Sequence, residues 1–198
     1  MAAAQITGIL LAAGAGSRFG GRKLLHRLAD GTALGVASLR NLRTALPHIV
    51  AVVRAGDTEL ADLLSAEGVT VVECANAHLG MGHTLAAGVL STSEAHGWIV
   101  ALGDMPCIAS KTIGAIKNEL ANGAPIVVPV WHGRRGHPVG FSHQFRDELM
   151  RLQGDVGARS ILASHSTQVR LLEVNDEGVV KDVDTLADVP RTGGTAKA

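Results

Sequence analysis

Apolar runs of strand length alternate with longer helical patterns along most of the chain. The first run, Ile6 to Ala13, is almost unbroken, and the later runs are continuous and rich in β-branched residues. Continuous runs indicate strands that are covered on both faces, whereas a strand with one solvated face alternates apolar and polar residues. The predicted strands cover residues 6–13, 49–53, 69–72, 98–102 and 126–130.

The segments between these strands have helical patterns. Asp57 is a candidate N-cap, and Gly68 and Gly123 are candidate helix stops. Because strands and helices alternate, the sequence predicts crossover units and a mainly parallel sheet. Such sheets bind ligands at the carboxyl ends of their strands, so the loops that follow the strands carry the candidate chemistry. The predicted helices cover residues 34–46, 57–66, 84–93 and 111–121.

The pattern changes after Val128. Residues 132–141 are typical of a hairpin, which predicts antiparallel additions to the sheet. Pro138 confines this segment to an edge strand or an irregular strand, because proline has no N–H to donate. Short helices are then predicted at 145–152 and from 154–160 onward, and short strands at 169–174 and 178–183.

The first predicted strand leads into a glycine-rich loop that carries three cations, Arg18, Arg22 and Lys23. Glycines let the backbone approach a ligand and turn its N–H groups toward an anion, while the cations neutralise charge. This combination favours a polyphosphate ligand. Phe19 stands where a dinucleotide fingerprint needs glycine, and Arg22 stands where a Walker loop needs lysine. An ordinary turn with a solvated basic rim is the alternative.

A second glycine-rich turn, residues 76–84, follows the predicted strand at 69–72 and leads into a helix. Its N–H groups and hydroxyls suit the recognition of a base or a ribose. A flexible turn that ends in a Thr84 cap is the alternative.

Acidic residues stand at two further strand ends. Asp104 follows the strand at 98–102 and is expected at the same sheet edge as the first glycine-rich loop. A carboxylate beside a polyphosphate is repulsive unless a cation lies between them, which predicts Asp104 as a magnesium ligand. A helix cap or a turn residue is the alternative. Asp182 and Asp184 lie two residues apart and share one face if the chain is extended there.

The predicted hairpin carries Arg134, Arg135 and His137. These side chains suit an anionic second substrate, and a solvated hairpin tip is the alternative. Cys107 follows Asp104 closely, but no base is evident near it in the sequence, so a packed thiol is favoured over a nucleophile.

Composition narrows the function classes. The chain has 198 residues, of which 46% are hydrophobic, and its 18 basic residues balance its 18 acidic residues. This balance, with only 3% aromatic residues, favours no nucleic-acid partner. No signal peptide or membrane-spanning run is evident, and the two separated cysteines are typical of free thiols in a reducing cytoplasm. One domain is expected over residues 1–191, with a frayed tail at 192–198.

Five motifs in order resemble the MobA-like NTP transferases of molybdenum cofactor maturation, and most closely the molybdenum cofactor cytidylyltransferases. The resemblance covers nearly the whole chain. The motifs are Leu11-Ala12-Ala13-Gly14 with Arg18 and Lys23, Gly103-Asp104-Met105-Pro106, Arg135-Gly136-His137-Pro138-Val139, Gly154-Asp155-Val156-Gly157-Ala158-Arg159, and Asp182-Val183-Asp184-Thr185.

The resemblance implies a Rossmann-like nucleotidyltransferase fold, with a mainly parallel three-layer sheet and antiparallel additions near the C-terminus. It implies transfer of CMP from CTP to a phosphate of molybdopterin, with magnesium as the metal and release of pyrophosphate. A molybdenum hydroxylase is the implied client.

The resemblance also implies residue roles. Arg18, Lys23 and Asp104 are the expected catalytic residues, Asp104 and Asp184 the metal ligands, and Arg135 and His137 the acceptor-binding residues. The expected nucleotide-binding residues are Leu11, Ala12, Ala13, Gly14, Gly16, Ser17, Arg18, Lys23, Gly82 and Thr84.

Two positions refine this expectation. Cytidylyl enzymes of the family tend to have alanine at the third position of the first loop and guanylyl enzymes glycine, so Ala13 favours CTP over GTP. One methyl group typically discriminates by only about 1–3 kcal/mol. Gly140 departs from the bulky apolar residue that is more usual there.

Four other readings stay open. Within the same fold, the protein could be a guanylyltransferase or could use a sugar phosphate or an alcohol phosphate as acceptor. It could instead be a non-catalytic partner that inserts the molybdenum cofactor into a client. A nicotinamide-dependent oxidoreductase is disfavoured by the glycine spacing of the first loop.

Overall fold

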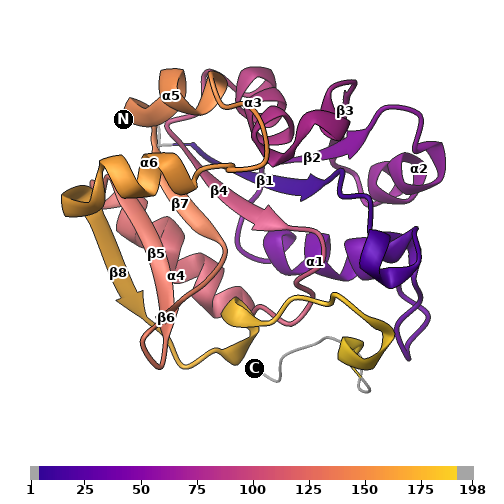
Figure 1. Ribbon diagram of the computed structural model, residues 1–198. Helices are drawn as coiled ribbons and strands as arrows, with labels where there is room; N and C mark the ends of the chain where they lie inside the picture. The colour runs from indigo at the N-terminus through magenta and orange to yellow at the C-terminus, as the bar shows by residue number, and fades with distance from the viewer. Residues whose placement is uncertain (1–4, 191–198) are drawn as a thin grey trace.

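A mixed sheet of eight strands forms the centre of the protein in the computed structural model, which describes residues 5–190. The strand order is β3-β2-β1-β4-β7-β5-β6, and β8 also pairs with β5 (Figure 1). The strands are β1 (Ile6–Ala12), β2 (Ile49–Arg54), β3 (Thr70–Cys74), β4 (Gly97–Leu102), β5 (Ile126–Trp131), β6 (Arg134–Arg135), β7 (Val139–Ser142) and β8 (Val169–Glu173).

The sheet combines parallel and antiparallel pairs as the sequence predicts. The pairs β1–β2, β1–β4, β2–β3 and β5–β8 are parallel, whereas β7 runs antiparallel to β4 and β5, and β6 antiparallel to β5. Every residue of β1 is buried, which agrees with its continuous apolar sequence. Because β1 runs parallel to both β2 and β4, the carboxyl ends of these three strands lie beside one another at one edge of the sheet.

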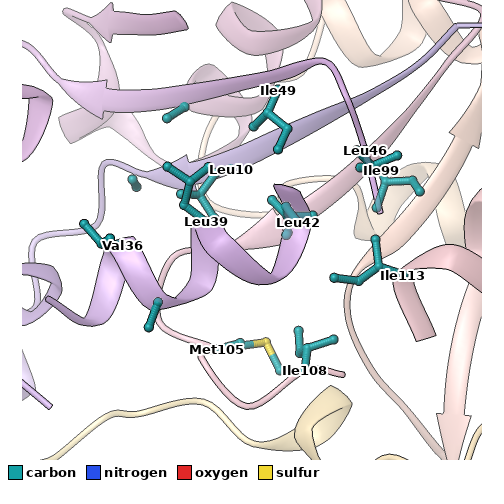
Figure 2. Close-up of a cluster of buried hydrophobic side chains, with 14 of the residues drawn as sticks. Leu10, Val36, Leu39, Leu42, Leu46, Ile49, Ile99, Met105, Ile108 and Ile113 are labelled. Atoms are coloured by element: carbon teal, nitrogen blue, oxygen red, sulfur yellow. The ribbon is translucent and has the colours of Figure 1, made fainter. Parts of the chain in front are cut away.

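Helices cover both faces of the sheet and make a three-layer structure (Figure 1). One buried cluster joins the sheet to α1 (Leu34–Arg43), α2 (Thr58–Ala66) and α4 (Ser110–Ala121). A second cluster joins the opposite face to α3 (Met81–Ser91), α5 (Arg146–Met150) and α6 (Arg159–Ser164). Figure 2 shows Leu39 and Leu42 of α1 directed toward Leu10 and the sheet.

Gly140 has a packing explanation. It lies in β7 beneath α4, where a Cβ would be 2.9 Å from Ile116 and 3.0 Å from Leu120. Glycine therefore lets the helix approach the sheet closely, and the departure from a bulky residue concerns this contact.

Some predicted local structure was wrong. Residues 178–183 do not form a strand: a 3-10 helix, Glu177–Val180, begins there because the Asp176 side chain accepts a hydrogen bond from the Gly178 N–H. The helix predicted from Thr84 begins at Met81. Pro138 directly precedes β7, which lies between β4 and β5 rather than at an edge.

Residues 174–188, which we call the C-terminal arm, return from β8 to the carboxyl end of β4 (Figure 1). The His137 N–H donates to the carbonyl of Val179 at 2.8 Å, and the Val183 N–H donates to the carbonyl of Asp104 at 3.0 Å. The arm is also close to the hairpin, since a Cβ on Gly136 would be 2.2 Å from the Val179 oxygen. It thus joins two loops that are far apart in the sequence.

Within residues 5–190, no helix is long and apolar enough to cross a membrane. The tail predicted at 192–198 lies outside the described residues.

Candidate active site

The glycine-rich loop after β1 folds into two 3-10 turns, Ser17–Phe19 and Lys23–Leu25. Gly16 has a left-handed conformation with φ of 61°, and a Cβ there would be 2.9 Å from the Cβ of Lys23. A residue with a side chain at Gly16 would therefore be strained and would push Lys23 aside. The glycine allows the loop to fold back and direct Lys23 toward the end of β4.

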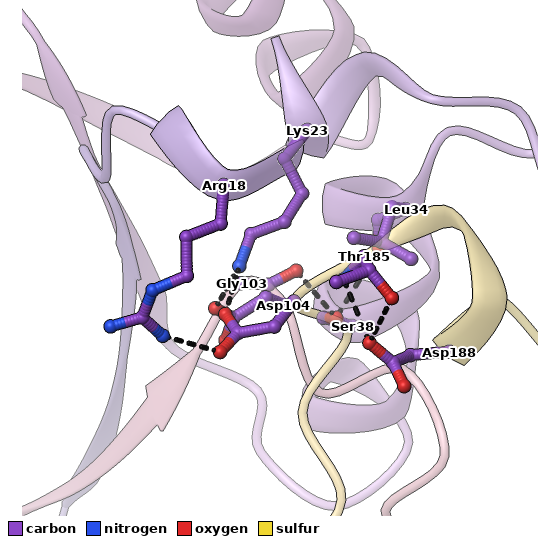
Figure 3. A network of polar contacts seen from close by, with 9 residues as sticks. Arg18, Lys23, Leu34, Ser38, Gly103, Asp104, Thr185 and Asp188 are labelled. Carbon is purple, nitrogen blue, oxygen red and sulfur yellow. Dashed lines mark hydrogen bonds and ion pairs between the residues drawn. The ribbon is translucent and has the colours of Figure 1, made fainter. Parts of the chain in front are cut away.

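Lys23 and Arg18 meet the acidic residues of the other loops (Figure 3). The Lys23 Nζ lies 2.7 Å from Oδ2 of Asp104 and 3.4 Å from Oδ1 of Asp184, and Arg18 donates to Oδ2 of Asp184 at 2.7 Å. The Lys23 side chain is 12% exposed and that of Arg18 is 78% exposed. Lys23 is therefore the inner cation of the site, and Arg18 lies at its solvent edge.

Burial disfavours the Lys23 ammonium, but the hydrogen bond from Lys23 to Asp104 and the negative charges of Asp104 and Asp184 outweigh that effect. The pKa of Lys23 is raised above its ordinary value as a result. Lys23 is consequently a fixed positive charge at neutral pH and not a candidate general base.

Three carboxylates gather at this point. Asp104, Asp182 and Asp184 each offer an oxygen within 4.8 Å of the others. The Oδ1 atom of Asp104 is buried and has no hydrogen-bond partner among residues 5–190. A buried carboxylate oxygen without a partner is costly, and oxygen ligands are those that Mg²⁺ and Mn²⁺ prefer. The cluster thus fits a divalent cation.

A cavity of about 340 Å³ opens beside the cluster. Its lining includes Leu11, Ala13 and Gly14 from the end of β1, Thr84 from α3, and Asp104. The structure therefore brings predicted nucleotide-binding residues from both glycine-rich turns to one cavity.

Other predicted nucleotide-binding residues lie around this cavity without lining it. Ala12 is buried in the core, and Ser17 begins the first 3-10 turn of the loop. Gly82 packs against the backbone of Gln153, where a Cβ would be 2.7 Å from the Gln153 oxygen. Gly82 thus joins α3 to the segment before α6.

A second cavity, of about 540 Å³, adjoins the first and shares Leu11 with it. It is lined mainly by apolar side chains, which come from β1, β4, β5 and β7 on one side and from α3, α6 and the segment before α6 on the other. The predicted acceptor residues Arg135 and His137 lie in its wall. A largely apolar cavity with a few polar groups is typical of a small-molecule site.

His137 is a buried side chain in this wall. Burial lowers its pKa below the ordinary value of 6.5 and outweighs the negative charge of Asp104, which acts in the opposite direction, while the positive charge of Arg159 adds to the lowering. Its Nδ1 atom is buried and has no hydrogen-bond partner among the described residues. His137 therefore presents a neutral ring at pH 7.

The structure adds cavity-lining residues to which the sequence analysis gave no role, and of these Arg54 was missed altogether. Arg54 lines the first cavity, Arg159 lines the second, and Asp155 lines both. Arg54 directly follows the apolar run at 49–53, so the strand-end rule that singled out Asp104 could have found it. The Cys107 thiol is half-buried, and burial raises its pKa, which agrees with the packed thiol predicted from the sequence.

Two cavities that are larger than these lie away from the acidic cluster. One of about 610 Å³ is at the amino ends of the strands and includes Gln5 and His48. Another of about 770 Å³ lies beside α4 and includes Cys107 and Lys181. Neither is lined by Lys23 or by a carboxylate of the acidic cluster.

Comparisons with known proteins agree with this picture. The MobA-like NTP transferase domain matches residues 8–169. Nicotine blue oxidoreductase from Paenarthrobacter nicotinovorans is 29% identical over 199 residues, which cover 94% of this chain and 95% of that protein.

Solved structures resemble it closely. Rv0371c from Mycobacterium tuberculosis H37Rv has a TM-score of 0.82 and 31% identity, with 94% of this chain and 96% of that chain covered. A structure of Rv0371c in complex with manganese has a TM-score of 0.74 and 31% identity, covering 93% and 95% of the two chains. Molybdopterin-guanine dinucleotide biosynthesis protein A from Archaeoglobus fulgidus shares the fold, with a TM-score of 0.67, 20% identity and 92% and 94% coverage.

Proposed function

We propose a reaction from the premise that this chain belongs to the MobA-like NTP transferase family and has a nucleotidyltransferase domain. The proposed reaction is the magnesium-dependent transfer of CMP from CTP to a phosphate of molybdopterin, with release of pyrophosphate. The observation that carries it is the meeting of Lys23, Asp104 and Asp184 at the mouth of a cavity lined by Ala13.

In the proposed reaction, positively charged residues bind the phosphates and negatively charged residues bind the metal. Backbone N–H groups of residues 13–17 and the cations Arg18 and Lys23 bind the triphosphate and the leaving pyrophosphate. Asp104 and Asp184 hold magnesium, which supplies charge neutralisation at the phosphates when bound. Such a transfer depends mainly on positioning and charge stabilisation, so no covalent nucleophile is required. Manganese in the related Rv0371c structure supports a divalent metal in this family.

The two adjoining cavities suit two substrates. Ala13 narrows the smaller cavity by one methyl group relative to glycine, which favours a cytosine base over guanine. The larger, mostly apolar cavity receives the acceptor, with Arg135 near its phosphate and the neutral His137 against its uncharged part. A molybdenum hydroxylase is the client that would receive the product.

The reaction is tested by incubating the protein with magnesium, molybdopterin and either CTP or GTP, and measuring pyrophosphate. We expect release with CTP and much less with GTP. Preference for GTP would contradict the role of Ala13 and support a guanylyltransferase. Release with a sugar phosphate or an alcohol phosphate in place of molybdopterin would change the acceptor. No release with any acceptor would favour a non-catalytic insertion partner.

The variant Asp104→Asn tests the metal site. Loss of a metal ligand should lower both turnover and Mn²⁺ affinity, by roughly 10–100-fold or more. The matched variant Asp62→Asn changes a carboxylate on α2, outside the acidic cluster, and should retain both. Full activity of the Asp104→Asn protein would remove Asp104 from the mechanism.

A redox reaction is the second candidate, because a relative of 29% identity is named an oxidoreductase. The cavity of about 540 Å³ is apolar enough to bind an aromatic dye. Oxidation of NADH or NADPH that requires both the protein and a dye, without release of pyrophosphate from CTP, would favour this reaction over nucleotidyl transfer.

A further inference from the structure

Arg54 is poorly paired for a half-buried arginine. It ends β2, and the only hydrogen bond of its side chain within residues 5–190 runs from Nη2 to the carbonyl of Ala13 at 3.4 Å. Its Nε atom is buried and has no partner there. Arg40 offers a contrast, since it bonds the Glu67 carboxylate at 2.7 and 3.1 Å. The folded chain therefore leaves the hydrogen-bonding capacity of Arg54 largely unused, and buried donors normally find partners.

Arg54 stands where the cavity meets the phosphate-binding loop. It lines the cavity of about 340 Å³ together with Ala13 and Thr84, and also an adjoining cavity of about 440 Å³ together with Lys23. Among the residues that line the smaller cavity, Arg54 is the only arginine or lysine. A base in that cavity would thus meet one strong cationic donor group.

We propose that Arg54 is a specificity-determining residue that reads the acceptor edge of the cytosine base. This inference rests on the proposed cytidylyl transfer and names a recognition residue within it. The guanidinium has donors only, and the O2 and N3 atoms of cytosine are both acceptors. Uracil carries an N–H at position 3, which turns one of these two contacts into a donor facing a donor. Arg54 therefore selects CTP over UTP, which Ala13 does not do because the two pyrimidines have the same size.

Arg18 and Lys23 are the cations that the proposed reaction assigns to the phosphates. Lys23 lies on the side of the acidic cluster and lines only the cavity of about 440 Å³. Since the triphosphate already has these cations, Arg54 is available for the base. A phosphate contact by Arg54 is the competing assignment, and the two differ in whether a ligand without a base feels the loss of the side chain.

The test compares calorimetric affinities of wild-type, Arg54→Ala and Arg54→Lys proteins for CTP, UTP and inorganic triphosphate in the presence of magnesium. We expect wild-type protein to prefer CTP to UTP, and Arg54→Ala to lose roughly tenfold or more in CTP affinity. Its affinity for UTP should fall less, and its affinity for triphosphate should not change. Arg54→Lys keeps the charge without the planar fork and should not restore the preference. Arg146→Ala on α5 controls for the removal of one positive charge.

Three results would overturn the proposal. Equal losses for CTP, UTP and triphosphate would assign Arg54 to the phosphates, and an unchanged preference for CTP in Arg54→Ala would remove it from recognition. Both results leave the transferase function in place. Wild-type protein that binds neither nucleotide in the presence of magnesium would instead remove the proposed function, and this inference with it.

Discussion

Lys23 owes its position to one glycine and its charge state to two carboxylates. Gly16 leaves the space that Lys23 occupies, and Asp104 and Asp184 hold its ammonium. His137 illustrates the opposite case, since its ring is buried without a carboxylate in hydrogen-bond contact and its pKa falls. At the scale of single residues, burial with or without a partner decides which side chains are charged in the site.

The lowered pKa of His137 predicts a pH-dependent stability. In the unfolded chain the histidine binds a proton below about pH 6.5, whereas in the folded protein it remains neutral to a lower pH. The unfolded state then binds more protons, so the free energy of unfolding should fall as the pH drops below 6.5. Urea unfolding at pH 7.5 and 5.5 would measure the fall, and it should be smaller in His137→Gln. Equal falls in the two proteins would contradict this expectation.

At the scale of elements, a single buried side chain, that of Asp176, joins the C-terminal arm to α4. Asp176 accepts hydrogen bonds from the Ala109 N–H at 2.9 Å, from the Thr112 hydroxyl at 2.7 Å, and from the Gly178 N–H at 3.1 Å. It therefore caps the beginning of α4 with a carboxylate from a distant segment, a favourable position relative to the helix dipole. The same residue fixes the part of the arm that precedes Asp182 and Asp184.

Replacing Asp176 with alanine should destabilise the protein by about 2–3 kcal/mol, because it removes a cap and leaves buried donors unpaired. Chemical denaturation would measure the loss. Asp188→Ala is the matched control: Asp188 accepts bonds from Thr185 in an exposed capping box, so this substitution should destabilise the protein much less. Similar losses for the two variants would contradict the role given to Asp176.

The fold of the strands could be predicted from the sequence, whereas the path of the C-terminal arm could not. The strands at 49–53, 98–102 and 126–130 were predictable because burial on both faces requires continuous apolar residues. The pairing of Asp104 with the loop after β1 followed from the rule for parallel sheets. The path of residues 178–183 did not, because it depends on contacts of Gly178 with Asp176 and with the Cys107 carbonyl, which no periodicity reports.

At the scale of the whole molecule, the sheet brings together groups from distant parts of the chain. Lys23 and Asp104 are 81 residues apart, and Arg18 and Asp184 are 166 apart. In the structure the cations assigned to phosphate are paired with the carboxylates assigned to metal. A metal ion and a triphosphate arriving together would satisfy both sets of groups at once.

This arrangement predicts that magnesium and CTP stabilise the protein cooperatively. Each ligand alone must break ion pairs, so its affinity and its effect on the melting temperature should be smaller than in the presence of the other ligand. The two together should raise the melting temperature by more than the sum of their separate effects. Thermal unfolding with each ligand, both and neither would measure this. In Lys23→Gln, Mg²⁺ alone should stabilise more than in the wild type, because the ammonium no longer competes for the carboxylates. Strictly additive shifts in the wild type would contradict the coupling.

The ion pairs of Lys23 and Arg18 also affect which ligands the site binds weakly. Lys23 and Arg18 already bind oxygens of Asp104 and Asp184, so a metal ion or a free inorganic phosphate that enters alone must displace a partner that is in place. Only a triphosphate that arrives with its metal ion gives both the cations and the carboxylates new partners. We therefore expect the resting protein to discriminate against incomplete substrates before the base is examined, with its own side chains serving as the competitors.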